Sequence, residues 1–113
     1  MERRALVDPR GGRWEVEVPR STRERARGLL GRDGVPPGHA MLFERTRSVH
    51  TVGMRFPITV AFLDPSMAVV AVRRMRPGRM AFRPRGSWHV LECAAGSDLR
   101  PGDDLVPADA RTD

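Results

Sequence analysis

The stretch Ile58-Thr-Val-Ala-Phe-Leu-Asp-Pro-Ser-Met-Ala-Val-Val-Ala-Val72 decides the fold class of this chain. Its first part, residues 58–63, is a short run rich in β-branched and aromatic side chains, which favours a buried strand. Successive side chains of a strand point to opposite faces, so Ile58, Val60 and Phe62 share one face. Residues 64–66, Asp-Pro-Ser, are typical of a turn, and residues 67–72 form the returning strand. The stretch therefore predicts a β-hairpin.

Short apolar segments of the same kind recur along the chain. They predict strands at residues 4–8, 14–18, 40–43 and 87–93, with weaker candidates at 49–52 and 104–106. Residues 76–86 contain two prolines and two glycines, so we expect a long irregular loop there. The sequence thus predicts a mainly β (α+β) fold, a small, partly barrel-like antiparallel sheet.

One short helix completes the predicted fold. Ser21-Thr-Arg-Glu24 fits a capping box, and Ala26, Leu29 and Leu30 have the spacing of a buried helical stripe, which predicts a helix over about residues 22–31. Gly28 lies on the opposite side of this helix. Its presence there indicates either fraying near the helix end or close approach of another backbone or a ligand.

Length and composition limit the class of protein. A chain of 113 residues has room for one domain, which we assign to residues 1–106, with a flexible polar tail at 107–113. There is no long apolar stretch and no apolar signal block after the N-terminus, so we expect a cytoplasmic protein without a membrane span. Cys93 is the only cysteine, which excludes an internal disulfide and a multi-cysteine zinc site. Nothing in the sequence indicates a cofactor.

The net charge of +6 is concentrated in one segment. All 20 basic residues are arginine, and the absence of lysine, asparagine and tyrosine indicates codon bias in a G+C-rich genome. Such bias does not determine where the charge lies. Between Asp64 and Glu92 there is no acidic residue, and the formal excess corresponds to six arginines: Arg73, Arg74, Arg76, Arg79, Arg83 and Arg85.

Several ordered motifs resemble one family. They are Thr22-Arg-Glu-Arg-Ala-Arg-Gly-Leu-Leu-Gly-Arg32, Ala40-Met-Leu-Phe43, His50-Thr-Val-Gly-Met-Arg-Phe-Pro-Ile58, Phe62-Leu-Asp64, Leu91-Glu-Cys-Ala-Ala-Gly96 and Gly102-Asp103. Over residues 14–106 the chain resembles the bacterial and archaeal proteins called domain of unknown function 192. The resemblance implies a compact, partly barrel-like β fold with one short helix and close packing at Gly28. It implies no activity, and Thr59 stands where the family usually has Asp.

The first candidate site consists of His50, Thr51, Met54 and Arg55, together with Glu92 in an otherwise apolar strand. A carboxylate buried alone costs several kcal/mol, so Glu92 requires a partner, and we expect Arg55 to supply it. One interpretation is structural: an ion pair and a hydrogen-bonded histidine that hold the loop. The other is a small cleft in which Arg55 and His50 receive an anionic group.

The second candidate is the basic segment from Arg73 to Arg85, in which Met75, Met80 and Phe82 alternate with the arginines. It is either a solvated loop or a binding surface for phosphate groups or an acidic protein. Two weaker candidates are catalysis by Cys93 with His50, and a metal site formed by His39, His50 and His89. A cysteine in an apolar strand is usually a packing residue, and the histidines lack ligand spacing, so we assign neither.

From these patterns we expect a small binding or accessory domain that recognises an anionic small ligand or an acidic partner surface. One alternative is a hydrolase-type enzyme that uses His50 and Glu92 as acid and base. Another is nucleic-acid binding through residues 73–85. The sequence does not decide whether the protein is an enzyme, nor its oligomeric state.

Overall fold

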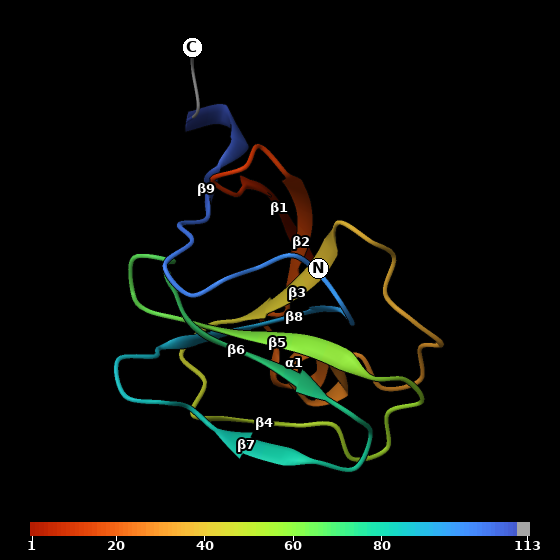
Figure 1. Cartoon of the computed structure of the whole chain (residues 1–113). Coiled ribbons are helices and arrows are strands. Elements are labelled where there is room, and N and C mark those ends of the chain that lie inside the picture. The colour runs from red at the N-terminus through yellow and green to blue at the C-terminus, as the bar shows by residue number, and fades with distance from the viewer. Residues whose placement is uncertain (111–113) are drawn as a thin grey trace.

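The computed structural model describes residues 1–110, and strands dominate it (Figure 1). Seven strands form one sheet in the order β6-β5-β8-β3-β2-β1-β9, and two further strands pair as β4-β7. In chain order the elements are β1 (Glu2–Val7), β2 (Arg13–Val18), α1 (Thr22–Arg27), β3 (His39–Phe43), β4 (Ser48–His50), β5 (Ile58–Leu63), β6 (Val69–Met75), β7 (Met80–Phe82), β8 (His89–Ala94), β9 (Val106–Pro107) and the 3₁₀ turn η1 (Ala108–Ala110). The large sheet curls into a half-barrel, which confirms the predicted fold class.

The hairpin predicted at residues 58–72 forms one edge of this sheet, with β6 outermost. β5 pairs with β6 on one side and with β8 on the other, antiparallel in both cases. The connecting turn is longer than predicted, because Asp64 accepts hydrogen bonds from the backbone N–H groups of Ser66 and Ala68 and β6 begins only at Val69. The β2-β3 pair is parallel, and residues 19–38, which include α1, make the crossover that such a pair requires.

Both faces of the sheet are buried, each under its own apolar cluster. Ala61 and Leu63 of β5 belong to the first cluster, with Trp14, Leu42 and Leu91. Ile58, Val60 and Phe62 belong to the second cluster, as the alternation predicted. Further members of the second cluster are Met41, Phe43, Met54 and Val90. The second cluster lies between the sheet, the end of α1 and the β4-β7 pair, and this is where the candidate site is found (Figure 1).

The predicted helix is correct at its start and wrong at its end. Ser21 and Glu24 form the expected capping box. The helix ends at Arg27, because Gly28 takes a φ of +49° that favours glycine. A Cβ at Gly28 would lie 3.2 Å from the Phe43 ring, so the close neighbour is an aromatic side chain. Leu29 is therefore buried from the turn after the helix, while Ala26 is exposed, and the predicted helical stripe does not exist.

The segment 76–86 is also more regular than predicted, because it contains β7. The three residues of β7 pair with β4, with Ser48 opposite Phe82 and His50 opposite Met80. Proline and glycine flank this strand without interrupting it. Residues 106–110 of the C-terminus form β9, which pairs with β1, and η1. The last residues of the predicted tail, 111–113, lie outside the described residues.

No helix among residues 1–110 is both long and apolar enough to cross a membrane.

Candidate functional site

Glu92 is a carboxyl group placed in an apolar layer. In β8, Leu91 and Cys93 point into the first cluster and Val90 into the second, so alternation directs Glu92 toward the second. Its register partners are Met41 in β3 and Val60 in β5, which are both buried. Only 6% of Glu92 is exposed. A position whose register partners in both neighbouring strands are apolar is thus occupied by an acid.

Nothing in the described part of the chain neutralises this acid. The Glu92 side chain makes no hydrogen bond and no ion pair with residues 1–110. Burial without compensation penalises the charged form and raises the pKa of Glu92 to about 7. Near neutral pH a large share of the molecules therefore carries a protonated Glu92, which is a hydrogen-bond donor.

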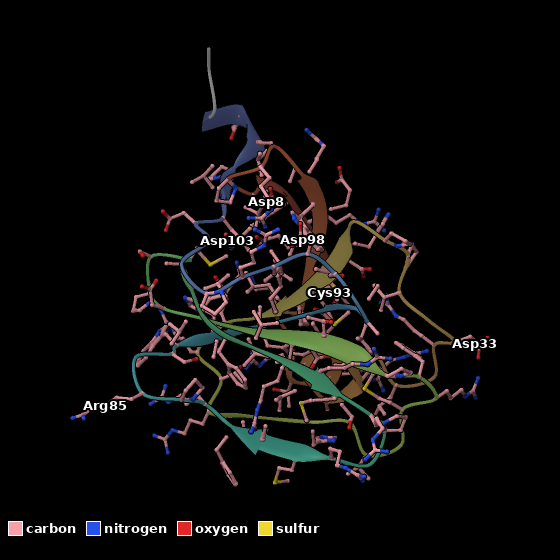
Figure 2. All side chains as sticks on the ribbon, in the orientation of Figure 1. Asp8, Asp33, Arg85, Cys93, Asp98 and Asp103 are labelled. Carbon is pink, nitrogen blue, oxygen red and sulfur yellow. The ribbon has the colours of Figure 1, made fainter. Side chains whose placement is uncertain are left out.

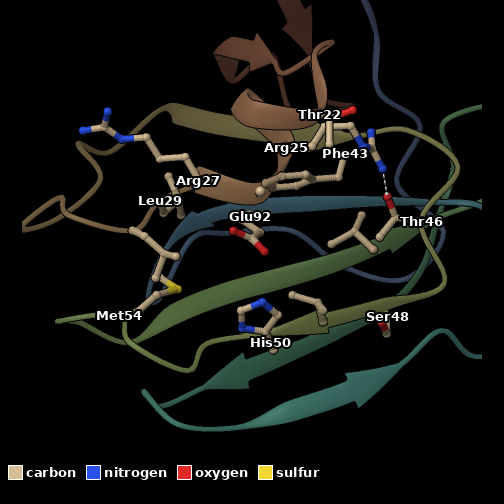
Figure 3. A pocket seen from close by; sticks show the side chains of 15 residues that line it. Thr22, Arg25, Arg27, Leu29, Phe43, Thr46, Ser48, His50, Met54 and Glu92 are labelled. Atoms are coloured by element: carbon tan, nitrogen blue, oxygen red, sulfur yellow. Dashed lines mark hydrogen bonds between the residues drawn. The ribbon is translucent and has the colours of Figure 1, made fainter.

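The Glu92 carboxyl faces a pocket of about 380 Å³ (Figure 3). This volume falls in the range of small-molecule sites. The apolar part of the lining consists of Leu29, Leu30, Phe43, Val49, Met54 and Val90, and the polar part consists of Thr22, Arg25, Arg27, Thr46, Ser48 and His50. Glu92 is the only acidic residue among them. Figure 3 shows the His50 imidazole across the pocket from the Glu92 carboxyl.

Local structure at α1 forms one wall of the pocket. The capping box fixes where the helix begins, and the glycine at 28 turns the chain so that Leu29 enters the lining. In the last turn of α1, the Arg25 guanidinium donates a hydrogen bond of 2.8 Å to the Thr46 hydroxyl (Figure 3). Because Arg25 makes no ion pair with an acid in the described residues, its positive charge remains available at the pocket.

The opposite wall is positioned by Thr51. This residue is fully buried, and its hydroxyl donates to the Arg76 carbonyl at 2.6 Å and accepts from the Arg79 N–H at 2.9 Å. Its backbone N–H also donates to the Arg79 carbonyl, and its carbonyl accepts from the Gly78 N–H. Thr51 therefore ties the turn between β6 and β7 to the end of β4, next to His50.

The structure brings together three of the five residues predicted for the cleft. His50, Met54 and Glu92 line the pocket, whereas Thr51 has the structural role just described. The predicted Arg55–Glu92 pair is wrong. Arg55 lies outside the lining and donates to Asp33 at 2.9 Å, and both side chains are largely exposed. Sequence reasoning chose Arg55 because it is near His50 along the chain, but that segment turns its guanidinium outward.

The basic groups that actually line the pocket were not predicted. Arg25 and Arg27 belong to α1, and neither the helix pattern nor the charge distribution distinguishes them from the other arginines. The one feature of the sequence that could have indicated them is their position in the helix motif from Thr22 to Arg32. Their approach to Glu92 depends on the crossover between the parallel strands β2 and β3, which no local pattern reveals.

Thr59, the residue that departs from the family pattern, lies away from the pocket. It belongs to the β5 face that carries Ala61 and Leu63, whereas Glu92 lies beside Val60. The Thr59 hydroxyl accepts a hydrogen bond of 3.1 Å from the Gly96 N–H and so holds the turn after β8. The chemistry of the pocket therefore does not depend on an acid at this position.

The six arginines predicted as a basic surface make no ion pair with the described acids. They do not form one loop. Arg73 and Arg74 lie in β6, Arg76 and Arg79 flank the turn held by Thr51, and Arg83 and Arg85 follow β7.

Cys93 is fully buried, and burial raises the pKa of its thiol to about 11. Among the described residues no cluster of His, Cys, Asp and Glu has the geometry to hold a metal.

Comparison with known proteins identifies relatives but no activity. Residues 5–106 match the family model of domain of unknown function 192 (DUF192), described as "Uncharacterized ACR". A protein of unknown function from Novosphingobium aromaticivorans has a similar structure (TM-score 0.75, 20% identity, 91% of this chain and 82% of that chain). A Sinorhizobium meliloti protein described as a putative transcription regulator is also similar (TM-score 0.79, 26% identity, 95% of this chain and 93% of that chain). No curated protein sequence matches the chain.

Proposed function

The chain belongs to the DUF192 family, and from the contents of its pocket we propose that it binds a small organic anion between α1, β4 and β8. The observation that carries the proposal is Glu92, a buried carboxyl that faces a cavity and has no partner among the described residues. A buried polar group without a partner costs stability. A ligand that supplies the missing partner gains the corresponding interaction energy.

The charge of the lining favours an anion. Arg25 contributes positive charge at the pocket, whereas the Arg27 guanidinium points away from it (Figure 3). The lone carboxyl is substantially protonated near neutral pH. A protonated Glu92 donates a hydrogen bond to a ligand oxygen, and the remaining N–H groups of the Arg25 guanidinium receive the negative group. The ring of Phe43 and the side chains of the second cluster favour an apolar body. A carboxylate or phosphate ester on a compact hydrocarbon frame satisfies all of these groups.

A direct test uses benzoate and phenyl phosphate as probes, with benzyl alcohol as the neutral counterpart. We expect both anions to raise the melting temperature and to shift NMR signals of residues 25–30 and 90–92, and the alcohol to do neither. Arg25→Ala should weaken anion binding about tenfold or more, because it removes a charge-assisted contact. The matched control is Arg55→Ala, which removes an arginine outside the pocket. Equal effects of the two variants, or no response to either anion, would overturn the proposal.

The affinity for an anion should decrease as the pH rises. As the pH rises through about 7, Glu92 ionises and repels an anion, so affinity should fall. The other charged or titratable groups of the lining are Arg25, Arg27 and His50. Glu92→Gln keeps a neutral hydrogen-bonding side chain, so this variant should bind at pH 8 more tightly than the wild type. His50 is present in both proteins, so the difference between them reports on Glu92.

The enzyme hypothesis is the second candidate, and the raised pKa of Glu92 is the observation that favours it. A carboxyl with a pKa of about 7, facing a histidine across a pocket, is suited to exchange protons near neutral pH. In a hydrolase, Glu92→Gln would abolish turnover of ester or phosphate-ester substrates. In the binding protein that we propose, the same variant retains the ligand. Turnover by the wild type that is lost in Glu92→Gln would therefore favour the enzyme.

A further inference from the structure

A second surface is formed where the β3-β4 connection meets the end of β7 and the start of β8. Backbone hydrogen bonds hold these segments together: the Arg83 N–H donates to the Arg47 carbonyl at 2.8 Å, and the Thr46 N–H donates to the Trp88 carbonyl at 3.0 Å. The Arg45 N–H donates to Nδ1 of His89. Residues 45–47 and 82–89, far apart in the sequence, thus form one surface, which we call the Trp88 surface.

Aromatic side chains are unusually exposed on the Trp88 surface. Phe82 is 72% exposed and Trp88 is 41% exposed, although each buries large apolar area in ordinary cores. The guanidinium carbon of Arg83 lies 5.2 Å from the centre of the Trp88 ring. This distance is that of a cation–π pair, so the Arg83 guanidinium lies over the Trp88 ring.

The charge of the Trp88 surface is uncompensated. Arg45, Arg47, Arg83 and Arg85 make no ion pair with an acid among residues 1–110, and Figure 2 shows Arg85 projecting away from the body of the molecule. The two segments contain no acid, and Glu44, which precedes Arg45, is paired with Arg4 and Arg20. Four guanidinium groups without an acidic partner among the described residues therefore lie in the segments that carry the two exposed aromatic rings.

We propose that the Trp88 surface binds single-stranded nucleic acid. Arginines that lie beside exposed rings match a backbone of phosphates with bases between them, since each base has a flat face that stacks on an aromatic ring or a guanidinium plane. A duplex offers phosphates but hides its base faces, and an acidic peptide offers carboxylates but no planes. This surface adjoins the anion pocket, since Thr46 belongs to both, but its exposed rings and Arg83 lie outside the pocket lining. It includes Arg45 and Arg47, which lie outside the predicted segment 73–85.

Binding is tested with a fluorescein-labelled twelve-residue poly(dT) strand at low and moderate salt. The logarithm of the affinity should fall linearly with the logarithm of the salt concentration, with a slope of about −3 if four phosphates are contacted. Phe82→Ala and Trp88→Ala should each weaken binding roughly tenfold, because one stacking contact is lost. Trp88→Phe keeps a stacking ring and should retain most of the affinity. The mutated side chains are exposed, so the fold should persist, and circular dichroism confirms it.

The controls separate stacking from general charge attraction. Arg3→Ala removes an exposed arginine of β1 and should change affinity much less than Arg83→Ala. A poly-glutamate peptide and a duplex of the same length serve as competitors. Absence of binding to the strand at low salt would overturn the proposal. So would equal affinity for poly-glutamate, or loss of binding with Arg3→Ala as large as with Phe82→Ala.

Discussion

Buried carboxyl groups have hydrogen-bond partners in one region of this molecule and, among the described residues, lack them in another. At the turn between β1 and β2 and in the loop before β9, Asp8 and Asp103 are 5% and 7% exposed. In the pocket, Glu92 is 6% exposed. The exposed fractions are therefore similar, but Glu92 lies deeper in the protein and lacks the partners that the two aspartates have. Asp8 and Asp103 are surrounded by donors, whereas Glu92 has none in the described part of the chain.

The partners reverse the effect of burial on the pKa. Burial acts to raise the pKa of Asp8, but hydrogen bonds from the Trp14 indole and from the backbone of Gly12 and Arg10 outweigh it and lower the pKa. The Arg10 guanidinium, at 2.7 and 3.0 Å, likewise lowers the pKa of Asp103. In Glu92, burial acts alone. Asp8 and Asp103 therefore stabilise the fold, whereas Glu92 costs stability, which is the pattern expected if Glu92 has the ligand-binding role that we propose.

The largest expected effect is the loss of stability when a buried, hydrogen-bonded carboxyl group is removed. Asp103→Ala removes the partner of Arg10 and the acceptor of the Arg100 N–H, so we expect unfolding free energy at pH 7 to fall by about 3 kcal/mol. Asp98→Ala is the matched control, because Asp98 contacts the same two arginines from an exposed position and should cost less than about 1 kcal/mol. Urea denaturation measures both. Equal losses of unfolding free energy in the two variants would mean that the burial of Asp103 adds nothing to its contribution to stability.

The next largest effect is a gain in unfolding free energy, which we expect when Glu92 is replaced by glutamine. The pKa of Glu92 is raised from an ordinary 4.5 to about 7, so its contribution to stability is complete below pH 4.5 and is lost as the pH rises through 7. At pH 8 we expect Glu92→Gln to be more stable than the wild type by up to about 3 kcal/mol, with little difference at pH 4. Glu15→Gln, at an exposed position, should show no such gain. A Glu92→Gln protein less stable than wild type at pH 8 would contradict the comparison.

A smaller effect is expected for Asp8→Asn. The amide keeps the size of the side chain but places a donor or a weaker acceptor against the Trp14 Nε1–H, so we expect a loss of about 1 to 2 kcal/mol at pH 7. Because the pKa of Asp8 is lowered from 3.8, its stabilisation is present above that pH and lost as the pH falls through the folded value. The difference between variant and wild type should therefore shrink in acid, as unfolding curves from pH 2 to 7 will show. A difference in unfolding free energy that stays constant over this pH range would contradict a role for the charge of Asp8.

The smallest effect concerns Arg55. Its pair with Asp33 is exposed on both sides, and such pairs contribute little. Arg55→Ala should change the unfolding free energy by less than about 0.5 kcal/mol and leave the pH dependence from Glu92 unaltered. If it shifted that dependence, Arg55 would contact Glu92 after all, as the sequence suggested.

The parts of this fold that follow from alternation were predictable. The faces of residues 58–63, the capping box at Ser21 and the buried carboxyl at Glu92 all follow from residue type and period. The end of α1 was missed because Gly28 was assigned to a helix face, whereas its positive φ ends the helix beside Phe43. β7 was missed because its three residues lie between proline and glycine and gain their stability from β4.

The site was only half predictable, for a topological reason. His50, Met54 and Glu92 lie in segments whose composition marks them, and the fold does bring them to one pocket. Arg25 reaches that pocket because α1 lies in the crossover from β2 to β3, a long-range pairing that local patterns do not encode. The expected charged partner of Glu92 does not exist among the described residues. Arg55 was chosen because it is near His50 along the chain, and it is exposed.

The measurement that tests this account most directly is the titration of Glu92 by NMR. With ¹³C-labelled glutamate, the carboxyl signal that disappears in Glu92→Gln identifies the group, and its shift is followed from pH 3 to 9. We predict a midpoint near pH 7, well above the ordinary 4.5 of a glutamate. A midpoint near the ordinary 4.5 would show that Glu92 is solvated or paired, and the pocket would lose the group on which its proposed function rests.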